Sequence, residues 1–414
     1  MRFRRLAIAV IWTLSGWAQP PAPVPVAPDP IAPLVAQLDL ERYKATIKGL
    51  TRFGDRRQGT DRNRAALDWI EAQLKSYGCS NVERLRYDYQ PPVRGAGGAS
   101  GRGAVGGSGV RAVGPSGAGG RGAASASGPG GSRRRGIRFP DTVNNDPMKQ
   151  PDVTLRELDT PPSIPGLREE VYCTKVGSTH PQEMYIVSGH MDGIGYGEAA
   201  NDDGSGSALV MELARIFSGP GVTTDRSIRF ALWNNEETGL DGATAYVKQR
   251  KDLQGKESPA GSGRYPEPTW LGMIQHDMML FDHGMPHRDG TMSKEQRPEA
   301  DVNIEYQVAS KFADAAMRLA NKFQLANERY ATDYPAAIGP HMTNTDSTPF
   351  MDLVPSISLR ENERGSQLGS GWDPHHHQPT DLYATFNDDD FRLGLNAAQM
   401  TLAAIAELTG AKSR

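Results

Sequence analysis

Two kinds of hydrophobic pattern alternate along most of the chain. Apolar residues at helical spacing, as in Leu67, Ile70 and Leu74, predict helices at residues 36–49, 63–77, 205–217, 307–323 and 389–408. Short apolar runs bounded by polar residues predict strands at residues 82–89, 170–176, 183–188, 227–233, 270–275 and 356–360. Strands that alternate with helices predict an α/β fold: a mainly parallel, mixed sheet with helices on both faces.

The amino-terminal residues have the pattern of an export signal. A basic start, Met1–Arg5, precedes an apolar run at 6–14, and small residues lead to Ala18, so we expect a signal peptide over 1–18. An uncleaved membrane anchor is the alternative, but the run is shorter than the ~20 residues that cross a bilayer. The proline-rich residues 19–35 predict an extended tether, followed by one catalytic domain at 36–410. The mature protein is expected to be secreted or periplasmic, without a transmembrane span.

An abrupt change of composition interrupts the domain at residues 93–146. Glycine, alanine, serine and arginine dominate there, and such a segment buries too little apolar surface to offset its ordering entropy, which predicts a disordered insertion. Its arginines could bind nucleic acid or acidic envelope polymers, but they lack the interleaved aromatic residues of single-strand binders. Since the net charge of the chain is −3, no nucleic acid partner is expected, and a low-complexity expansion is favoured.

The chain contains two cysteines, Cys79 and Cys173. One precedes the predicted strand at 82–89 and the other lies in the strand at 170–176. If these strands pair antiparallel, the sulfur atoms could meet, and an exported protein would permit the bond. The sequence leaves a disulfide and two buried thiols equally open, because it does not give the Cα separation.

Histidines and carboxylates recur near the ends of the predicted strands. They are His190, Asp192, Asp202, Glu236, Glu237, Asp277 and His377. Sheets of this kind bind ligands at the carboxyl ends of their strands, so we expect these side chains to meet. Two histidines with several carboxylates are donors for two zinc ions, and the spare glutamate suits a general base. Each residue alone could be a helix cap or a solvated charge, but their joint position at strand ends favours chemistry.

The local spacing suggests a different role for each of these side chains. Asp192 lies two residues after His190, close enough to hold the second imidazole nitrogen. Asp202 lies in a glycine- and serine-rich turn, where its two oxygens could bridge two cations. Glu236 and Glu237 are neighbours whose side chains diverge at a strand end, so one could bind metal while the other faces substrate.

The motifs Gly-His-Met-Asp-Gly at 189–193, Ala-Asn-Asp-Asp-Gly-Ser-Gly at 200–206 and Asn-Glu-Glu-Thr-Gly-Leu at 235–240 resemble those of the two-zinc exopeptidases. This family includes bacterial leucyl aminopeptidases, aminopeptidase Y, plasma glutamate carboxypeptidase and the glutaminyl cyclases. The resemblance implies two Zn²⁺ ions, one held by His190 and Asp277 and the other by Glu237 and His377, with Asp202 bridging them. It also implies that Glu236 is the general base and that peptides are the substrates.

For three of the assignments that the resemblance implies, the sequence leaves an alternative open. His377 is chosen from three consecutive histidines because it precedes Asp381 by four residues, with His376 as the fallback. Asp277 is chosen over Asp282 because it follows its strand directly, although the adjacent His276 is unusual for the family. The segment at 345–350 resembles a loop near the metals, so Asp346 and Ser347 are expected to meet the amino terminus of the substrate or to form a structural turn.

The resemblance leaves several functions to compare. We expect an aminopeptidase; the alternatives are a glutaminyl cyclase, a dipeptide-directed carboxypeptidase and a non-catalytic binding relative. The intact turn at 201–206 favours hydrolysis over cyclisation, and the filled ligand positions disfavour a non-catalytic role. Arg360 and Arg364 could serve a carboxypeptidase by binding a terminal carboxylate. Zinc suits the donors best, although manganese and cobalt also fit, and the oligomeric state is not indicated.

Overall fold

The computed structural model describes residues 29–79, 81–91, 164–195, 197–282, 302–339, 345–361, 373 and 375–413. The predicted export signal at 1–18 and the predicted insertion at 93–146 lie outside the described residues. The same holds for residues 19–28 of the predicted tether.

The secondary structure alternates between strands and helices along the described chain. The strands are β1 (Val82–Tyr89), β2 (Gly166–Lys175), β3 (His180–His190), β4 (Val222–Thr223), β5 (Arg226–Trp233), β6 (Thr269–His276), β7 (Val302–Glu305), β8 (Ala336–Gly339), β9 (Ser356–Glu361) and β10 (Lys412–Ser413). The helices are α1 (Ala32–Val35), α2 (Leu40–Thr51), α3 (Asp61–Ser76), α5 (Gly204–Phe217), α6 (Asp241–Arg250), α7 (Ala313–Tyr330) and α8 (Asp388–Thr409), with short 3-10 turns at Lys251–Leu253 and Tyr383–Thr385.

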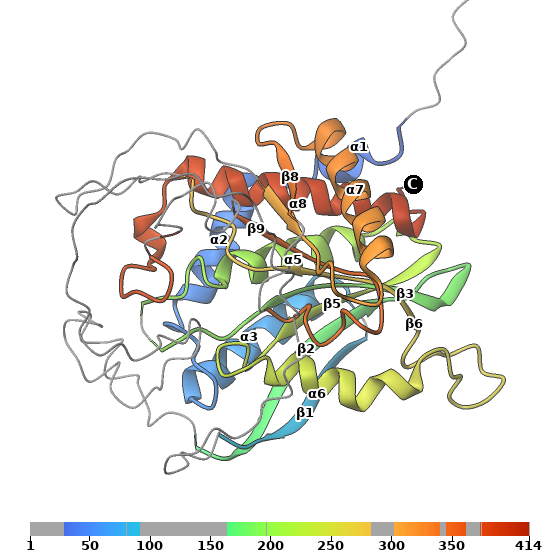
Figure 1. Ribbon diagram of the computed structural model, residues 1–414, viewed down its shortest axis with the longest axis horizontal. Coiled ribbons are helices and arrows are strands. Elements are labelled where there is room, and N and C mark those ends of the chain that lie inside the picture. Colours follow the sequence, from blue (N-terminus) through green and yellow to red (C-terminus); the bar gives the residue numbers. More distant parts are fainter. Residues whose placement is uncertain are drawn as a thin grey trace, which may run out of the picture.

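One mixed sheet of eight strands, in the order β1-β2-β5-β3-β6-β9-β7-β8, forms the centre of the fold (Figure 1). Strands β5, β3, β6 and β9 are parallel, whereas β1 and β2 pair antiparallel at one edge and β7 runs antiparallel to β9 near the other. The fold class predicted from the sequence is therefore confirmed. The carboxyl ends of the parallel central strands lie together at one end of the sheet. The residues that follow these strands are therefore close to one another.

Helices cover the two faces of this sheet unequally. On one face α5 packs on β3 and β5, and α2 and α8 pack on α5 (Figure 1). This side contains the larger apolar core, with Phe217 and Phe230 buried within it. On the other face α6 covers a smaller core rich in aromatic residues, including Trp233 and Tyr246. Because β3 is covered on both faces, its carboxyl-terminal half is buried throughout.

Helix boundaries follow local capping. The side chain of Asp203 accepts a hydrogen bond from Gly206 N and so starts α5, and Asn387 forms a capping box with Asp390 at the start of α8. Helix α8 ends at Gly410, which has a left-handed backbone conformation. The helix predicted from residue 307 begins later, at Ala313, because residues 308–312 form turns and a bend before it.

The packed part of the chain begins before the predicted domain boundary at Ala36. Helix α1 lies in the stretch for which we predicted an extended tether, and its Leu34 and Val35 are buried against the core that contains α8. Asp29 forms an ion pair with Arg329 of α7 at 2.8 Å. The apolar residues among the prolines explain this difference, because they give the segment surface to bury. No helix in the described ranges is long and apolar enough to cross a membrane.

The two cysteines form a disulfide that joins the end of α3 to β2. Strands β1 and β2 pair antiparallel as predicted, with Val82 opposite Cys173, and the Cα atoms of Cys79 and Cys173 are 6.2 Å apart. The bond closes a loop of sequence separation 94, and both residues are buried. The bond therefore links the segment after α3 to β2, two parts of the chain that are far apart in the sequence.

Replacing both cysteines by serine should destabilise the protein by about 2–5 kcal/mol, since long closed loops restrict the unfolded chain most. Urea denaturation of the Cys79→Ser/Cys173→Ser variant against wild type measures this. Wild type treated with a mild reductant without denaturant is the control, and it should keep the bond because both sulfurs are buried. Equal stability of the variant and wild type would contradict the prediction.

Candidate metal centre

The predicted ligand and base residues meet at the carboxyl ends of the parallel strands. His190 is the last residue of β3, Asp277 follows β6 directly, and Glu236 and Glu237 follow β5. Asp202 lies in the turn before α5, and His377 comes from the loop that precedes α8. Five separate segments thus contribute to one site.

The first cluster of ligand atoms surrounds His190. Its Nε2 atom lies 3.2 Å from Asp202 Oδ1 and 3.7 Å from Asp277 Oδ1. One ligand atom each from His190, Glu236 and Asp277 lies within 4.8 Å of the others, a spacing that could hold a metal ion. The predicted pairing of His190 with Asp277 therefore agrees with the geometry.

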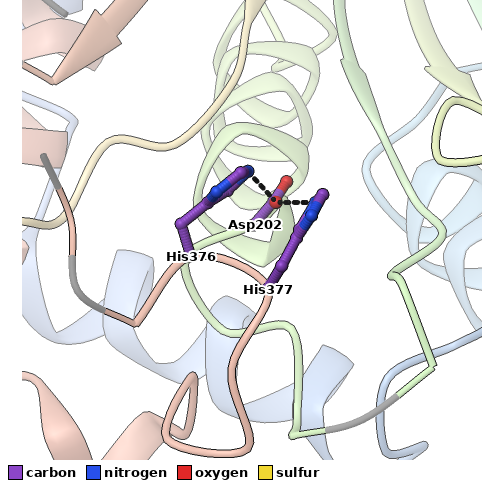
Figure 2. Close-up of side chains that lie close together, drawn as sticks. All are labelled: Asp202, His376 and His377. Atoms are coloured by element: carbon purple, nitrogen blue, oxygen red, sulfur yellow. Dashed lines mark ion pairs between the residues drawn. The ribbon is translucent and has the colours of Figure 1, made fainter. Parts of the chain in front are cut away.

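The second cluster lies on the other side of Asp202. His377 Nε2 is 3.1 Å from Asp202 Oδ2 and 3.0 Å from Glu237 Oε2. The neighbouring His376 also takes part: its Nε2 is 3.4 Å from the same oxygen, and Figure 2 shows both rings pointing to the one carboxylate. Asp202 thus directs one oxygen to each cluster, which is the arrangement a bridging ligand needs. The fallback residue His376 and the chosen His377 are both present at the site.

The electrostatics of this site indicate cations. Burial raises the pKa of Glu236 well above its ordinary value, and burial together with Asp202 raises the pKa of Glu237 to about 7. Although burial opposes it, the imidazoles of His190 and His377 hold the pKa of Asp202 well below its usual range. Glu237 Oε1 is buried and has no hydrogen-bond partner among the described residues. Imidazole and carboxylate donors with this excess of negative charge fit two zinc ions.

The structure corrects the predicted role of Asp192. His190 Nδ1 lies 3.0 Å from the main-chain oxygen of Asp192, while the carboxylate oxygen is 3.8 Å away, beyond hydrogen-bond distance. The carboxylate instead accepts a hydrogen bond from Glu236 N at 3.1 Å. A main-chain carbonyl orients an imidazole as well as a carboxylate does, so Asp192 orients His190 through its backbone and the Glu236 segment through its side chain.

The surroundings of Asp277 distinguish it from the alternative residues. Asp277 Oδ2 accepts a hydrogen bond from Thr345 and lies 2.7 Å from the guanidinium of Arg360, which also lies 3.6 Å from Glu305. Arg360 is buried and holds the pKa of Asp277 below its ordinary value against the effect of burial. Asp282 binds the hydroxyl of Tyr334 instead.

The unusual His276 has a structural role in the described fold. Its ring nitrogens lie 3.0 Å from Ser188 O and 2.9 Å from Thr401 Oγ1, so it joins β3, β6 and α8. Burial lowers the pKa of His276 to about 4, which keeps the ring neutral at physiological pH. It therefore makes its contacts away from the two clusters.

Replacing Arg360 by methionine should destabilise the metal-free protein by about 3–5 kcal/mol, because it leaves the buried carboxylates of Asp277 and Glu305 without this cation. Urea denaturation of the metal-free protein measures the change. Arg360→Lys is the control that keeps the charge and should lose less. A methionine variant as stable as wild type would show that the ion pair does not stabilise the fold.

The predicted substrate residues Asp346 and Ser347 are both buried. Ser347 Oγ lies 2.5 Å from Ser358 Oγ of β9, and its side chain has no exposed surface. Asp346 is fully buried, neither of its oxygens has a hydrogen-bond partner among the described residues, and burial raises its pKa well above the ordinary value. Ser347 therefore joins the turn to β9, and a role of Asp346 or Ser347 in substrate binding stays a prediction.

Several residues that support the site were not assigned this role from the sequence. Arg56 is buried and donates hydrogen bonds to the main-chain oxygens of Met191, Glu198 and Ala199, so it connects the segments that carry His190 and Asp202.

Two aspartates hold the ligand segments together through main-chain amides. Asp203 accepts hydrogen bonds from His190 N at 2.9 Å and Met278 N at 3.3 Å, and Asp381 accepts one from Asp202 N at 3.1 Å. Asp203 lies in the motif at 200–206, and Asp381 served in the sequence only as a marker for His377. The long-range partners of both residues could not be read from the sequence.

An α/β sheet with clusters of histidines and carboxylates where its parallel strands end is the arrangement of a metal-dependent hydrolase. The family model described as peptidase family M28 matches residues 170–399. This is more than half of the chain, and the chain belongs to that family.

Curated relatives match over short segments. Carboxypeptidase Q of Mus musculus is 37% identical over 104 residues, which are 24% of this chain and 22% of that protein. Aminopeptidase YwaD of Bacillus subtilis is 37% identical over 79 residues, 19% of this chain and 17% of that protein. The matched segments therefore cover only about a fifth of the length of each of these relatives.

Solved structures match over nearly the whole fold. BSAP, a zinc aminopeptidase from Bacillus subtilis, has a TM-score of 0.56 at 15% identity and covers 90% of this chain and 96% of its own. A glutaminyl cyclase from Bacteroides thetaiotaomicron has a TM-score of 0.53 at 12% identity, covering 89% and 98%. At these identities the likeness concerns the fold, which hydrolases and cyclases share.

Proposed function

We propose that the protein is a two-zinc aminopeptidase that hydrolyses peptide bonds at the amino terminus of peptides. The observation that carries this proposal is Asp202, whose two oxygens face two separate clusters. His190 and Asp277 would hold one zinc ion, Glu237 and His377 the other, and Asp202 both. When bound, the zinc ions would lower the pKa of a water molecule and polarise the carbonyl group.

Glu236 is the general base in this proposal. It is partly exposed, so it can reach water and substrate, and Asp192 fixes its main chain. Glu236 accepts a proton from the attacking water as the water oxygen bonds to the carbonyl carbon. It then donates this proton to the nitrogen as the carbon–nitrogen bond breaks.

The charges of the described residues around the clusters support an aminopeptidase; Arg364, the other candidate for binding a terminal carboxylate, lies outside the described residues. A carboxypeptidase needs an accessible cation for the terminal carboxylate. Arg56 and Arg360, whose guanidinium groups act on the site, are both buried and paired within the protein, so neither offers one. The site is rich in carboxylates, which favours an ammonium group instead. Carboxypeptidase activity stays the second candidate because of the local identity to carboxypeptidase Q.

Glutaminyl cyclisation is less well supported. Cyclases of the family use one zinc ion, whereas the described residues contain two groups that could each hold a metal ion. Asp202 approaches a histidine of each group, which favours a two-metal hydrolase.

We also propose that the protein is exported from the cytoplasm. The disulfide between Cys79 and Cys173 supports it, because such bonds persist in oxidising compartments and are rare in the cytosol. Fractionation of producing cells, with amino-terminal sequencing of the mature chain, tests the export and the predicted cleavage after Ala18.

Zinc content and hydrolysis of aminoacyl nitroanilides by the purified protein test the function. Two zinc ions per chain and chelator-sensitive release of nitroaniline support an aminopeptidase. The same assay with amino-blocked dipeptides, which have a free carboxylate, tests the carboxypeptidase candidate. Cleavage of the blocked dipeptides alone would replace the proposal by that candidate, and one zinc ion with cyclisation of amino-terminal glutamine would replace it by the cyclase.

A further inference from the structure

The segment that carries the two neighbouring glutamates begins with a residue in a strained backbone conformation. Strand β5 ends at Trp233, and Asn235 then has a φ of 62°, in the left-handed region that residues with a Cβ atom rarely adopt. Asparagine tolerates this region better than most residues, but such a conformation persists only where the surrounding contacts impose it. Since Glu236 and Glu237 follow directly, the contacts that hold Asn235 also determine where these two carboxylates point.

The side chain of Asn235 is buried, and both polar atoms of its amide have partners. Its Oδ1 atom accepts a hydrogen bond from the hydroxyl of Tyr87 at 2.8 Å, and its Nδ2 atom donates to Thr238 Oγ1 at 3.1 Å. The same hydroxyl lies 3.1 Å from the main-chain oxygen of Asn234. Tyr87 belongs to β1 at the edge of the sheet, so this distant strand contacts the two residues directly before Glu236.

A pair of side-chain amides fixes Asn234 to helix α3. Asn63 Nδ2 donates to Asn234 Oδ1 at 3.1 Å, and Asn234 Nδ2 donates back to Asn63 Oδ1 at 3.0 Å. Asn63 also donates to the main-chain oxygen of Arg56 at 2.7 Å, and Arg56 connects the segments that carry His190 and Asp202. The segment thus starts from a fixed point, and the contacts of its next residue determine its course.

We propose that Tyr87 is a positioning residue for the general base. Its hydroxyl donates to Asn235 Oδ1, holds that residue in the left-handed conformation and so keeps the carboxylate of Glu236 beside the first cluster. In the structure a ligand atom of Glu236 lies within 4.8 Å of those of His190 and Asp277. The proposal rests on the role of Glu236 in the proposed function.

Removal of the Tyr87 hydroxyl leaves Asn235 Oδ1 buried without this donor. A buried acceptor that has lost its partner is costly, so the amide should turn towards another donor and the backbone of Asn235 should follow. A displacement of about 1 Å at a reacting group can lower the rate of a well-oriented reaction by about 10²-fold. Glu237 has its own contact with His377 at 3.0 Å, so zinc binding should change less than the action of the base.

The first test compares Tyr87→Phe with the control Tyr172→Phe. Both tyrosines belong to the smaller core covered by α6, but the hydroxyl of Tyr172 lies 3.0 Å from Glu83 Oε2, near the start of β1. For Tyr87→Phe we expect kcat to fall by about 10–10²-fold, with KM and zinc content unchanged. Tyr172→Phe should keep kcat even if its Tm falls. Unchanged kcat in Tyr87→Phe, or an equal fall in the control, would overturn the proposal.

Substitutions of Asn235 test the left-handed conformation itself. Asn235→Gly retains access to this conformation because glycine has no Cβ atom, whereas Asn235→Ala disfavours it, so alanine should lower kcat more than glycine. In the glycine variant Tyr87 has no side-chain oxygen to hold at position 235. Adding Tyr87→Phe to Asn235→Gly should therefore lower kcat by less than about twofold. An equal effect of Tyr87→Phe in both backgrounds would show that Tyr87 acts elsewhere.

Crystal structures of the zinc-loaded Tyr87→Phe and Asn235→Ala variants give a result that does not depend on activity. We expect residue 235 of the alanine variant to leave the left-handed region, and the carboxylate of Glu236 to move by about 1 Å or more in both variants. A carboxylate that stays in place in both would contradict the positioning role. A wild type that hydrolyses no peptide substrate would refute the proposed function, whereas the displacement of Glu236 would still decide the role of Tyr87.

Discussion

Replacing Glu236 by glutamine is expected to lower kcat by about 10²–10⁴ while both zinc ions remain bound. Glutamine keeps the shape of the side chain and removes the group that accepts the proton of the attacking water. The main-chain contact of residue 236 with Asp192 is unaffected by the change, so the geometry of the loop should persist. Steady-state kinetics and metal analysis on the same preparation measure the two quantities.

The adjacent variant Glu237→Gln is the control for this experiment. Glu237 Oε2 lies 3.0 Å from His377 Nε2, so its replacement should weaken zinc binding at the second cluster. The two glutamates are therefore expected to differ: one loses chemistry at full metal content, the other loses metal. Because a ligand atom of Glu236 also lies within 4.8 Å of those of His190 and Asp277, loss of zinc in Glu236→Gln would identify it as a ligand and refute its role as base.

Much of the sheet could be predicted because its central strands are strongly apolar. The range predicted for β1 agrees with the structure residue for residue, and the predicted cores of β3, β5 and β9 lie within the observed strands. The site residues at the ends of β3, β5 and β6 could also be predicted to meet, because parallel strands end on the same side of a sheet. In contrast, β7 and β8 have four residues each, and α6 has a weak apolar pattern, so none was predicted.

The parts of the site that were not predicted depend on contacts between distant segments. That Asp192 binds His190 through a main-chain oxygen is decided by the path of the loop, which side-chain spacing does not reveal. The burial of Asp346 follows from how its turn packs under β9. Arg360 was considered only for the carboxypeptidase alternative, and its ion pair with Asp277 could not be read from the sequence. Residue type identified the ligands, whereas tertiary packing determined their partners.

Replacing Asp202 by asparagine is expected to weaken zinc binding at both clusters and to reduce hydrolysis to background. One oxygen of Asp202 lies 3.2 Å from His190 Nε2 and the other 3.1 Å from His377 Nε2. The amide carries no charge and offers one oxygen, so it serves at most one of the two ions. Loss of even an outer partner of a ligand costs 10–100-fold in affinity, so each zinc should bind at least about 10²-fold more weakly. Competition with a chromogenic chelator measures both constants.

The contrast with His377→Ala makes this prediction specific to a bridging ligand. His377 contacts Asp202 and Glu237 but belongs to the second cluster alone, so its loss should remove one zinc ion and leave the ion at His190 and Asp277. A bridging residue must affect both ions, because the two share its charge. If Asp202→Asn kept one ion at wild-type affinity, the clusters would be independent sites. The carboxylate would then serve one metal, and a mechanism that needs both ions on one substrate would lose its structural basis.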